Sequence, residues 1–444
     1  MRHALRQAIA DGVLTPGVRL PSTRALAADL GIARGVVVEV FEQLTAEGWL
    51  TARHGSGTTV AAHPAAVRPP STGPRDRPIA ALDLRPARPD VSAFPRNDWV
   101  AATRAVLADL PHEQLSYGDV RGPARAREVL SSYLARVRGV RTTPDLVLLT
   151  EGFSAALSVV VATLSAAGIR RIAVEDPGGY EPRRTAAAAG AELLPVRVDD
   201  EGLRVDALER SKAGAVLVTP AHQYPMGHVL GAERRVALAD WARRTGGWVL
   251  EDDYDAEFRY DREPVGSLQG LLPDRTIYLG SVAKTLAPAV RVGWVVAPEE
   301  LFSDVAATRK ARSSQHATLD HLVVAQLVDE GRYDRHLRKL RSRYRARRDT
   351  VLETLATAGL NDQVAGVAAG LHAVLLLEDE DDVAIVDAIH DRGVEVVPLS
   401  WYAIASDVRG LVVGFGQRSA TDLRRGIEVI AATIAAAGRG DVSR

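Results

Sequence analysis

The chain has 444 residues, of which 46% are hydrophobic and 25% charged, with a formal net charge of -1 and no cysteine. This length predicts roughly two or three domains, because single hydrophobic cores stop growing below this size. The absence of cysteine excludes disulfides and thiolate metal sites, and we expect no metal site. No apolar run approaches the ~20 residues of a membrane span, and the N-terminus lacks a signal-peptide core, so we expect a cytoplasmic protein without membrane contact.

Residues 1–62 predict a winged helix-turn-helix that binds DNA. Three helical stretches, ALRQAIADGVL, STRALAADLGI and RGVVVEVFEQLTAEGWL, precede the β-like ending LTARHGSGTTVAA. A helix-turn-helix needs two short helices joined by a tight turn, the second lying in the major groove. The second and third stretches supply them, with Gly31 at the turn and Ile32, Val37 and Phe41 as core positions. The glycine-rich RHGSG, residues 53–57, would form the tip of the wing.

The expected DNA contacts come from these helices and from the wing. They are Arg24, Arg34, Gly35, Val36, Arg53, His54 and Gly55. The first 63 residues hold six arginines against five acids, a net charge of only +1, so we expect weak binding by one head and dimeric binding to two half-sites. The apolar GVV after Arg34 predicts few polar base contacts and more weight on thymine methyl groups.

The rest of the chain predicts a linker and an α/β body. Residues 63–80 are rich in Pro, Arg and Ser without apolar periodicity, which is typical of a linker. Residues 81–440 alternate short apolar strands with amphipathic helices, which predicts a mostly parallel sheet covered on both faces. Long helices and an α+β tail over about 301–440 predict a separate, smaller domain.

Polar residues directly follow the predicted strands. Ligands of such sheets bind at the carboxyl ends of the strands, so we expect these residues to share one rim. They include Glu151 to Ser154 after DLVLLT, Tyr180 after RIAVEDP, His222 to Tyr224 after AVLVTP, Glu251 to Tyr254 after WVL, and Ser281 after TIYLG. Phe153 and Ser154 open a helix whose free N–H groups suit a phosphate.

Lys284 in YLGSVAKTLAPAVRVGW is one of only four lysines, beside 51 arginines. A lysine, a carboxylate, an aromatic residue and a phosphate cup with Ser281 and Arg291 together fit pyridoxal phosphate. The aldehyde of that cofactor needs a primary amine for a Schiff base, and arginine stays protonated. Its pyridine nitrogen needs a carboxylate, and its phosphate needs Ser, Arg and backbone N–H groups.

Several segments closely resemble MocR/GabR-type bacterial transcription regulators. EDDYDAEFRYD, YLGSVAKTLAPAVRVGW, VTPAHQYPMG, LSYGDVRG and RHLRKLRSRYRARRD resemble the aminotransferase-like domain of that family. The stretch LPSTRALAADLGIARGVVVEVFEQLTAEGWLTARHGSGTTV resembles its GntR-type winged helix-turn-helix. The resemblance covers nearly the whole chain and implies a fold-type I, pyridoxal-phosphate-dependent aminotransferase-like domain behind a DNA-binding head.

The resemblance also implies roles for individual residues. Lys284 would form the Schiff base, Asp252 would pair with the pyridine nitrogen, and Tyr254 would lie near the cofactor phenolate. The remaining contacts are Ser281, Arg291, Phe153 and Ser154 at the phosphate, Tyr180 stacked on the ring, and Tyr117 reaching the phosphate from the partner of a head-to-tail homodimer. His222 and Gln223 are either cofactor contacts or ordinary loop residues.

Two departures from the family bear on function. Val412 in LVVGFGQRS stands where relatives often carry an arginine that grips a substrate carboxylate, so only Arg409 or Arg418 is left to replace it. EDPGGYEP, around Tyr180, has one more glycine than usual. The main hypothesis is a regulator that senses pyridoxal phosphate, an amine or an amino acid. The alternatives are an active aminotransferase with an appended DNA-binding domain, and a cofactor-free dimerisation scaffold.

Overall fold

The computed structural model describes residues 1–10, 13–53, 57–61, 80–260, 265–312, 317–366, 369–378 and 380–440. The predicted DNA contacts His54 and Gly55 lie outside these residues. The chain divides into two compact units, Met1–Pro78 and Ile79–Arg444, each of which is described by itself. No helix of the described residues is both long enough and apolar enough to cross a membrane.

The first unit is a small helical domain with a β-hairpin. Its elements are α1 (Arg2–Ala10), α2 (Thr23–Leu30), α3 (Arg34–Ala46), β1 (Leu50–Arg53) and the antiparallel β2 (Gly57–Val60). The Ser22 side chain caps α2, and Gly31 ends it in the left-handed conformation that glycine adopts without strain. Val37 and Phe41 are buried as predicted.

The prediction for Ile32 was wrong, because its side chain is 38% exposed. Ile32 lies between the left-handed Gly31 and Ala33, the residue at the N-cap of α3. It therefore belongs to the turn and not to the inward face of either helix. The core of this unit consists of Leu20, Ala27, Val37, Phe41, Leu44, Leu50 and Val60.

The second unit is built around an eight-stranded sheet with the strand order β4-β11-β10-β9-β8-β5-β6-β7. The bounds are β4 (Val147–Thr150), β5 (Arg171–Asp176), β6 (Glu192–Asp199), β7 (Gly202–Leu203), β8 (Ala215–Val218), β9 (Trp248–Asp253), β10 (Thr276–Ser281) and β11 (Gly293–Val296). Strands β10, β9, β8, β5 and β6 are parallel, whereas β11 and β7 pair antiparallel with their neighbours.

Helices cover both faces of this sheet, as the continuous apolar strands predict. They are α4 (Arg96–Asp109), α5 (Ala124–Arg138), α6 (Phe153–Ala166), α7 (Tyr180–Ala188), α8 (Val205–Ser211), α9 (Ala232–Thr245), α10 (Leu268–Leu271), α11 (Glu299–Arg312) and α12 (Thr318–Asp329). The neighbours Val249 and Leu250 of β9 are both buried but belong to different core clusters, because successive side chains point to opposite faces.

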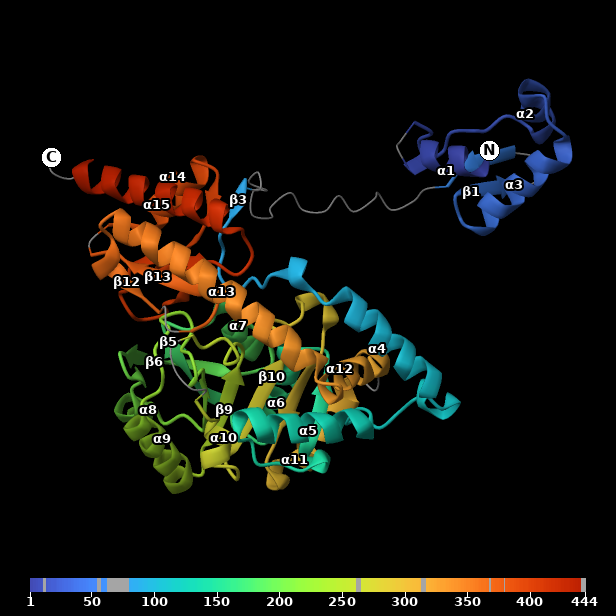
Figure 1. The fold of residues 1–444 in the computed structure, drawn as a ribbon. Coiled ribbons are helices and arrows are strands. Elements are labelled where there is room, and N and C mark those ends of the chain that lie inside the picture. The colour runs from blue at the N-terminus through green and yellow to red at the C-terminus, as the bar shows by residue number, and fades with distance from the viewer. Residues whose placement is uncertain are drawn as a thin grey trace. The chain divides into compact units, whose positions relative to one another are not determined.

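A smaller domain carries the C-terminal part of the chain, in orange and red in Figure 1. Its antiparallel sheet has the order β12 (Val364–Ala365), β13 (His372–Leu376), β16 (Gly410–Gly414) and β15 (Val397–Pro398), and its helices are α13 (Arg332–Thr357), α14 (Asp382–Asp391) and α15 (Ala420–Gly440). Short 3-10 turns are η1 (Val91–Ala93), η2 (His112–Leu115), η3 (Pro144–Leu146), η4 (Pro288–Val290), η5 (Asn361–Gln363) and η6 (Leu399–Tyr402).

The small domain differs from the predicted range 301–440 in two respects. Helices α11 and α12 pack on α6, α5 and α4, so they belong with the large sheet. The two-residue strand β3 (Leu82–Asp83) pairs in parallel with β14 (Val394–Glu395), so the start of this unit lies in the small domain. The segment after β3 then runs into the large domain and carries Ala87 to the rim of the sheet.

Candidate functional site

A cavity of about 1030 Å³ lies at the carboxyl ends of the parallel strands. The ends of β5, β9 and β10, the first turns of α6 and α7, and the small-domain turn η6 contribute to its wall. Eight of the residues predicted for the cofactor line it: Lys284, Asp252, Tyr254, Ser281, Arg291, Phe153, Ser154 and Tyr180. The predicted rim is therefore one continuous site.

Lys284 lies just after β10, and its side chain is half-buried in the cavity wall. Its ammonium group donates a hydrogen bond to the carbonyl oxygen of Ala87 at 2.5 Å. Burial lowers the pKa of Lys284, although Asp255 and Asp252 act in the opposite direction. The amine therefore loses its proton more readily than an exposed lysine, as a nucleophile at neutral pH requires.

Asp252, the next-to-last residue of strand β9, is a buried carboxylate with an unused acceptor. Its Oδ1 atom has no hydrogen-bond partner among the described residues. Burial raises the pKa of Asp252 well above its ordinary value, with further contributions from Asp253, Asp255 and Glu175. A buried acceptor of this kind needs a donor, and a protonated ring nitrogen in the cavity would supply one.

The part of the cavity at the start of α6 suits a phosphate. Helix α6 begins after Gly152, whose φ of +90° excludes most other residues, and its first N–H groups have no partner within the helix. A Cβ atom on Gly293 would lie 2.7 Å from the backbone of Gly152, so the two chain segments can approach this closely only with glycine at position 293. Ser281, Ser154 and Arg291 line the same region, and Arg291 holds a left-handed φ of +56°.

An aromatic group forms the wall beside Tyr254. Sequence reasoning named Tyr224 only as a strand-end residue, yet its ring lines the cavity and packs edge-on against Tyr254 and Tyr402 at 5.6 and 5.4 Å. The hydroxyl groups of Tyr224 and Tyr402 lie 3.1 Å apart. The available signal was an aromatic ring beside the proline of HQYP, in the segment that follows β8.

Gln223 does not line the cavity, which favours the ordinary loop residue over the cofactor contact that was its alternative. Its amide nitrogen donates to the carbonyl oxygens of Pro177 and Tyr224, at 3.0 and 2.9 Å, and its amide oxygen accepts from Met226 N–H. These hydrogen bonds hold the turn that contains Tyr224. Tyr180, the first residue of α7, lines the cavity and is 54% exposed.

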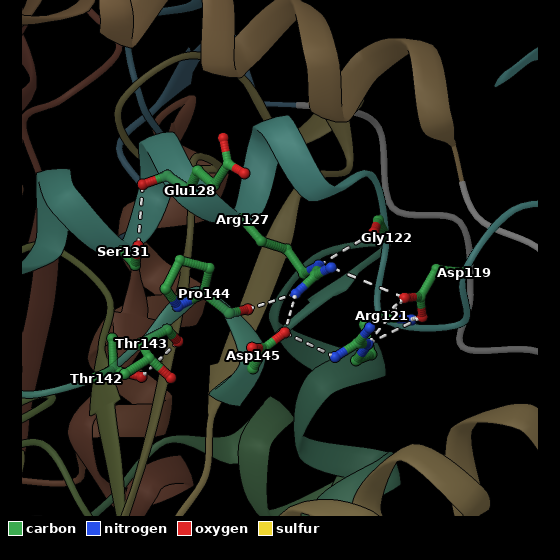
Figure 2. Close-up of polar contacts among 10 residues, drawn as sticks. All are labelled: Asp119, Arg121, Gly122, Arg127, Glu128, Ser131, Thr142, Thr143, Pro144 and Asp145. Atoms are coloured by element: carbon green, nitrogen blue, oxygen red, sulfur yellow. Dashed lines mark hydrogen bonds and ion pairs between the residues drawn. The ribbon is translucent and has the colours of Figure 1, made fainter.

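Tyr117 lies outside the cavity of its own chain, with 83% of its surface exposed. The loop that follows it is held by ion pairs (Figure 2): Arg121 contacts Asp119 at 2.6 Å and Asp145 at 3.0 Å. The buried Arg127 donates to the carbonyl oxygens of Gly122 and Pro144 at 3.2 and 2.6 Å. An exposed aromatic side chain is thus presented next to a well-anchored loop.

Other lining residues were missed because they come from inside a strand, from within a helix or from the small domain. They are Glu175 near the end of β5, Arg183 in α7, and Ser400, Trp401, Tyr402 and Ala403 in and after η6. Val412 is buried in an apolar cluster with Met226, Val374, Leu399 and Tyr402. Neither Arg409 nor Arg418 lines the cavity, so neither takes the place of an arginine at position 412.

In the first unit, the predicted DNA contacts Arg24, Arg34, Gly35 and Val36 are exposed. Arg34 and Gly35 are the first two residues of α3, and Val36 follows them. Arg53 is the last residue of β1, at the base of the wing. The arrangement agrees with a recognition helix whose first turn is free to approach a DNA groove.

Comparisons with known proteins define the class of both units. Residues 1–60 match the family described as bacterial regulatory proteins, gntR family, and residues 90–426 match aminotransferase class I and II. The second unit has the fold of solved aminotransferases, such as the multiple substrate aminotransferase of Thermococcus profundus (TM-score 0.75, 23% identity, 82% of this chain and 93% of that one) and an archaeal alanine:glyoxylate aminotransferase (TM-score 0.72, 23% identity, 79% and 90%).

The relatives that match most of this chain are named as transcription regulators. The chain is 35% identical to the pyridoxine biosynthesis transcriptional regulator PdxR of Corynebacterium glutamicum, over 96% of this chain and 93% of that protein. It is 32% identical to the probable rhizopine catabolism regulatory protein MocR of Rhizobium meliloti, over 95% and 90%. The chain belongs to the MocR-type family of transcription regulators, with a GntR helix-turn-helix and an aminotransferase-like domain.

Proposed function

We propose that this regulator binds pyridoxal phosphate through Lys284 and changes its DNA binding in response to the cofactor. The observation that carries the proposal is the pairing, within one cavity, of a half-buried lysine of lowered pKa and a buried aspartate with an unused oxygen. The fold family typically uses this cofactor.

The residues present fit the chemical groups of pyridoxal phosphate. When bound, the cofactor supplies an aldehyde for a primary amine and an electron-withdrawing ring. Lys284 would hold the aldehyde carbon, and Asp252 would accept a hydrogen bond from the ring nitrogen. Ser281, Arg291 and the first N–H groups of α6 would bind the phosphate. Tyr254 would donate to the ring oxygen, and Tyr180 would pack on the ring.

We infer that the signal is pyridoxal phosphate itself and not an amino acid. A carboxylate would need a free cation in the outer part of the cavity, and Val412 is apolar and buried. Arg183 lines the cavity, but its guanidinium group donates to the carbonyl oxygens of Tyr402 and Trp401 at 2.8 and 3.2 Å. The name of the relative PdxR, a regulator of pyridoxine biosynthesis, agrees with this choice.

The test is a titration of the full-length apo protein with pyridoxal phosphate, followed by visible absorbance and by operator binding. We expect wild type to develop the visible band of lysine-bound cofactor and to change its DNA affinity. Lys284→Ala should lose both responses. Lys310→Ala, on the exposed side of α11, is the matched control and should behave as wild type. A band of equal strength in Lys284→Ala would show that another group binds the cofactor.

An active aminotransferase is the second candidate, because the amine of Lys284 and the carboxylate of Asp252 line one cavity, as amine transfer requires. The measurement that separates the two functions is release of keto acid over many cycles from a panel of amino acids and amines. Sustained turnover would favour the enzyme, and a single half-reaction at most would favour the regulator.

A further inference from the structure

A buried hydrogen-bonded pair lies behind Tyr254. The Tyr254 hydroxyl lies 2.8 Å from Nδ1 of His222, and the same ring nitrogen lies 3.0 and 3.2 Å from the carboxylate oxygens of Asp255. His222 and Asp255 are each only 1% exposed. Tyr254 lines the cavity, whereas His222 and Asp255 do not. The pair can therefore reach a ligand only through Tyr254.

The surroundings of His222 decide which ring nitrogen carries the proton. Nε2 is buried and has no hydrogen-bond partner within the described part of the chain. A proton on Nε2 would be an unsatisfied buried donor, and it would leave the lone pair of Nδ1 against the carboxylate of Asp255. A proton on Nδ1 avoids both costs, because it is donated to Asp255 and to the Tyr254 oxygen. The assigned neutral form is therefore Nδ1–H.

We propose that His222, oriented by Asp255, is a positioning residue that turns the Tyr254 O–H into the cavity as a hydrogen-bond donor. Once the Tyr254 oxygen accepts from His222, its own proton is left for another acceptor, and within the protein that acceptor is the Asp255 carboxylate, which also interacts with this hydroxyl. The cavity side offers the anionic ring oxygen of the proposed ligand, so this inference rests on the proposed function.

The small domain covers the pair from the other side. A Cβ atom on Gly370 would lie 2.2 Å from His222 Cε1 and 2.6 Å from an oxygen of Asp255, so only glycine fits there. The ring of His372, in β13, lies 5.5 Å from the ring of His222. This close packing helps to hold the His222 ring in place, as a residue that orients another requires.

Several titratable groups surround His222, Asp255 and Tyr254. They are Asp252, Tyr224, His228, Glu257, Tyr260, Lys284 and His372. Burial, followed by the effect of Asp255, raises the pKa of Tyr254 well above its ordinary value, so the phenol keeps its proton. Burial and the neighbouring His222 lower the pKa of His372 to about 3, so His372 adds no charge.

The test is a pH titration of the visible absorbance of the cofactor-loaded protein. A donor on the ring oxygen stabilises negative charge there, and this makes the lysine nitrogen give up its proton at lower pH. Loss of the donor should raise the midpoint by about one to two pH units, as expected for a hydrogen bond to a charged group. We expect this rise in Tyr254→Phe and in His222→Gln, and no additional rise in the double variant.

His222→Asn is the matched control, because its amide nitrogen takes the place of Nδ1–H. It should keep the wild-type midpoint, whereas a purely steric role for His222 would shift Asn and Gln alike. The nitrogen chemical shifts of the His222 ring in the apo protein provide a cofactor-free measurement that does not depend on any variant. They should report Nδ1–H, and an Nε2–H form would overturn the inference.

Two outcomes distinguish a failure of the His222 role from a failure of the proposed function. If wild type develops no visible band with pyridoxal phosphate, the proposed function fails. If wild type shows the band and His222→Gln titrates with the same midpoint, the function stands and the positioning role of His222 is wrong.

Discussion

Glu175 is a buried carboxyl group in the cavity wall, and burial disfavours its charged form. Its Oε2 atom accepts from the Thr219 hydroxyl at 2.6 Å and from the amide of Gln223 at 3.3 Å. Burial nevertheless raises the pKa of Glu175 to about 7, from an ordinary value of 4.5. The carboxyl group is therefore half-protonated near neutral pH in the folded protein, and ionised in the unfolded chain.

The consequence is a pH-dependent loss of stability that Glu175→Gln should remove. Between pH 4.5 and about 7 the unfolded chain releases a proton that the folded protein keeps, so stability falls as pH rises through this window. Glutamine has no such proton. The free energy of unfolding of Glu175→Gln, relative to that of wild type, should therefore rise by at most about 3 kcal/mol from pH 4.5 to pH 8, because one pKa unit corresponds to about 1.36 kcal/mol.

Urea unfolding of the apo protein at pH 5 and pH 8 would measure this change. Glu209→Gln, at an exposed position, is the control. Its free energy of unfolding should differ from that of wild type by the same amount at both pH values. An equal stability difference between Glu175→Gln and wild type at both pH values would mean that Glu175 does not hold its proton in the folded state.

Hydrogen bonds join residues 176–183 of the large domain to residues 401–406 of the small domain beside the cavity. We call these two segments the clasp. The carboxylate of Asp176 accepts from the backbone N–H groups of Ile404, Ala405 and Ser406 at 2.7 to 2.9 Å, and from the Ser406 hydroxyl at 3.0 Å. Arg183 and the N–H of Gly178 donate to the carbonyl oxygen of Tyr402 at 2.8 and 2.9 Å. The clasp joins the large domain to the small one beside the ligand cavity.

We expect Asp176→Asn and Arg183→Met to accelerate release of bound pyridoxal phosphate by about ten- to hundredfold. The reason is that each variant removes hydrogen bonds to a charged group, worth about 1.5–3 kcal/mol, that keep Trp401 and Tyr402 at the cavity mouth. Stopped-flow dilution with visible absorbance would measure the rate. Arg184→Met is the matched control, because Arg184 is exposed and pairs with Glu181 in its own helix. Unchanged release rates in both clasp variants would exclude the clasp as a barrier.

Whether a site residue could be predicted from the sequence depends on the element that carries it. Lys284, Asp252 and Ser281 were predicted because each lies at or just after the end of a buried strand, and parallel strands bring their carboxyl ends to one edge. Arg183 and Trp401 were not predicted, because they reach the cavity through tertiary packing between elements far apart in the chain. No periodicity marks the clasp, and strand β3, with two residues, is too short to leave a pattern.

At the scale of the whole molecule, we propose that the exposed Tyr117 completes the site of a second copy of this chain. Tyr117 is 83% exposed, and the loop that follows it is held by the contacts of Arg121 and Arg127. Such a side chain is suited to a second copy of this chain, as the family resemblance implies. We therefore expect Tyr117 of one subunit to contribute to the cavity that contains Lys284 of the other.

Mixed dimers test this expectation directly. The dimer to test has one Tyr117→Ala subunit and one Lys284→Ala subunit and is isolated through two affinity tags. If Tyr117 contributes to the site of the other subunit, one site of this dimer has both residues and the other site lacks both. We expect such dimers to bind half the wild-type amount of pyridoxal phosphate at wild-type affinity. If Tyr117 acted within its own chain, both sites would carry one defect and no tight site would remain. Asp252→Asn paired with Lys284→Ala is the control, because both residues line the cavity of one chain, and its mixed dimers should have no intact site.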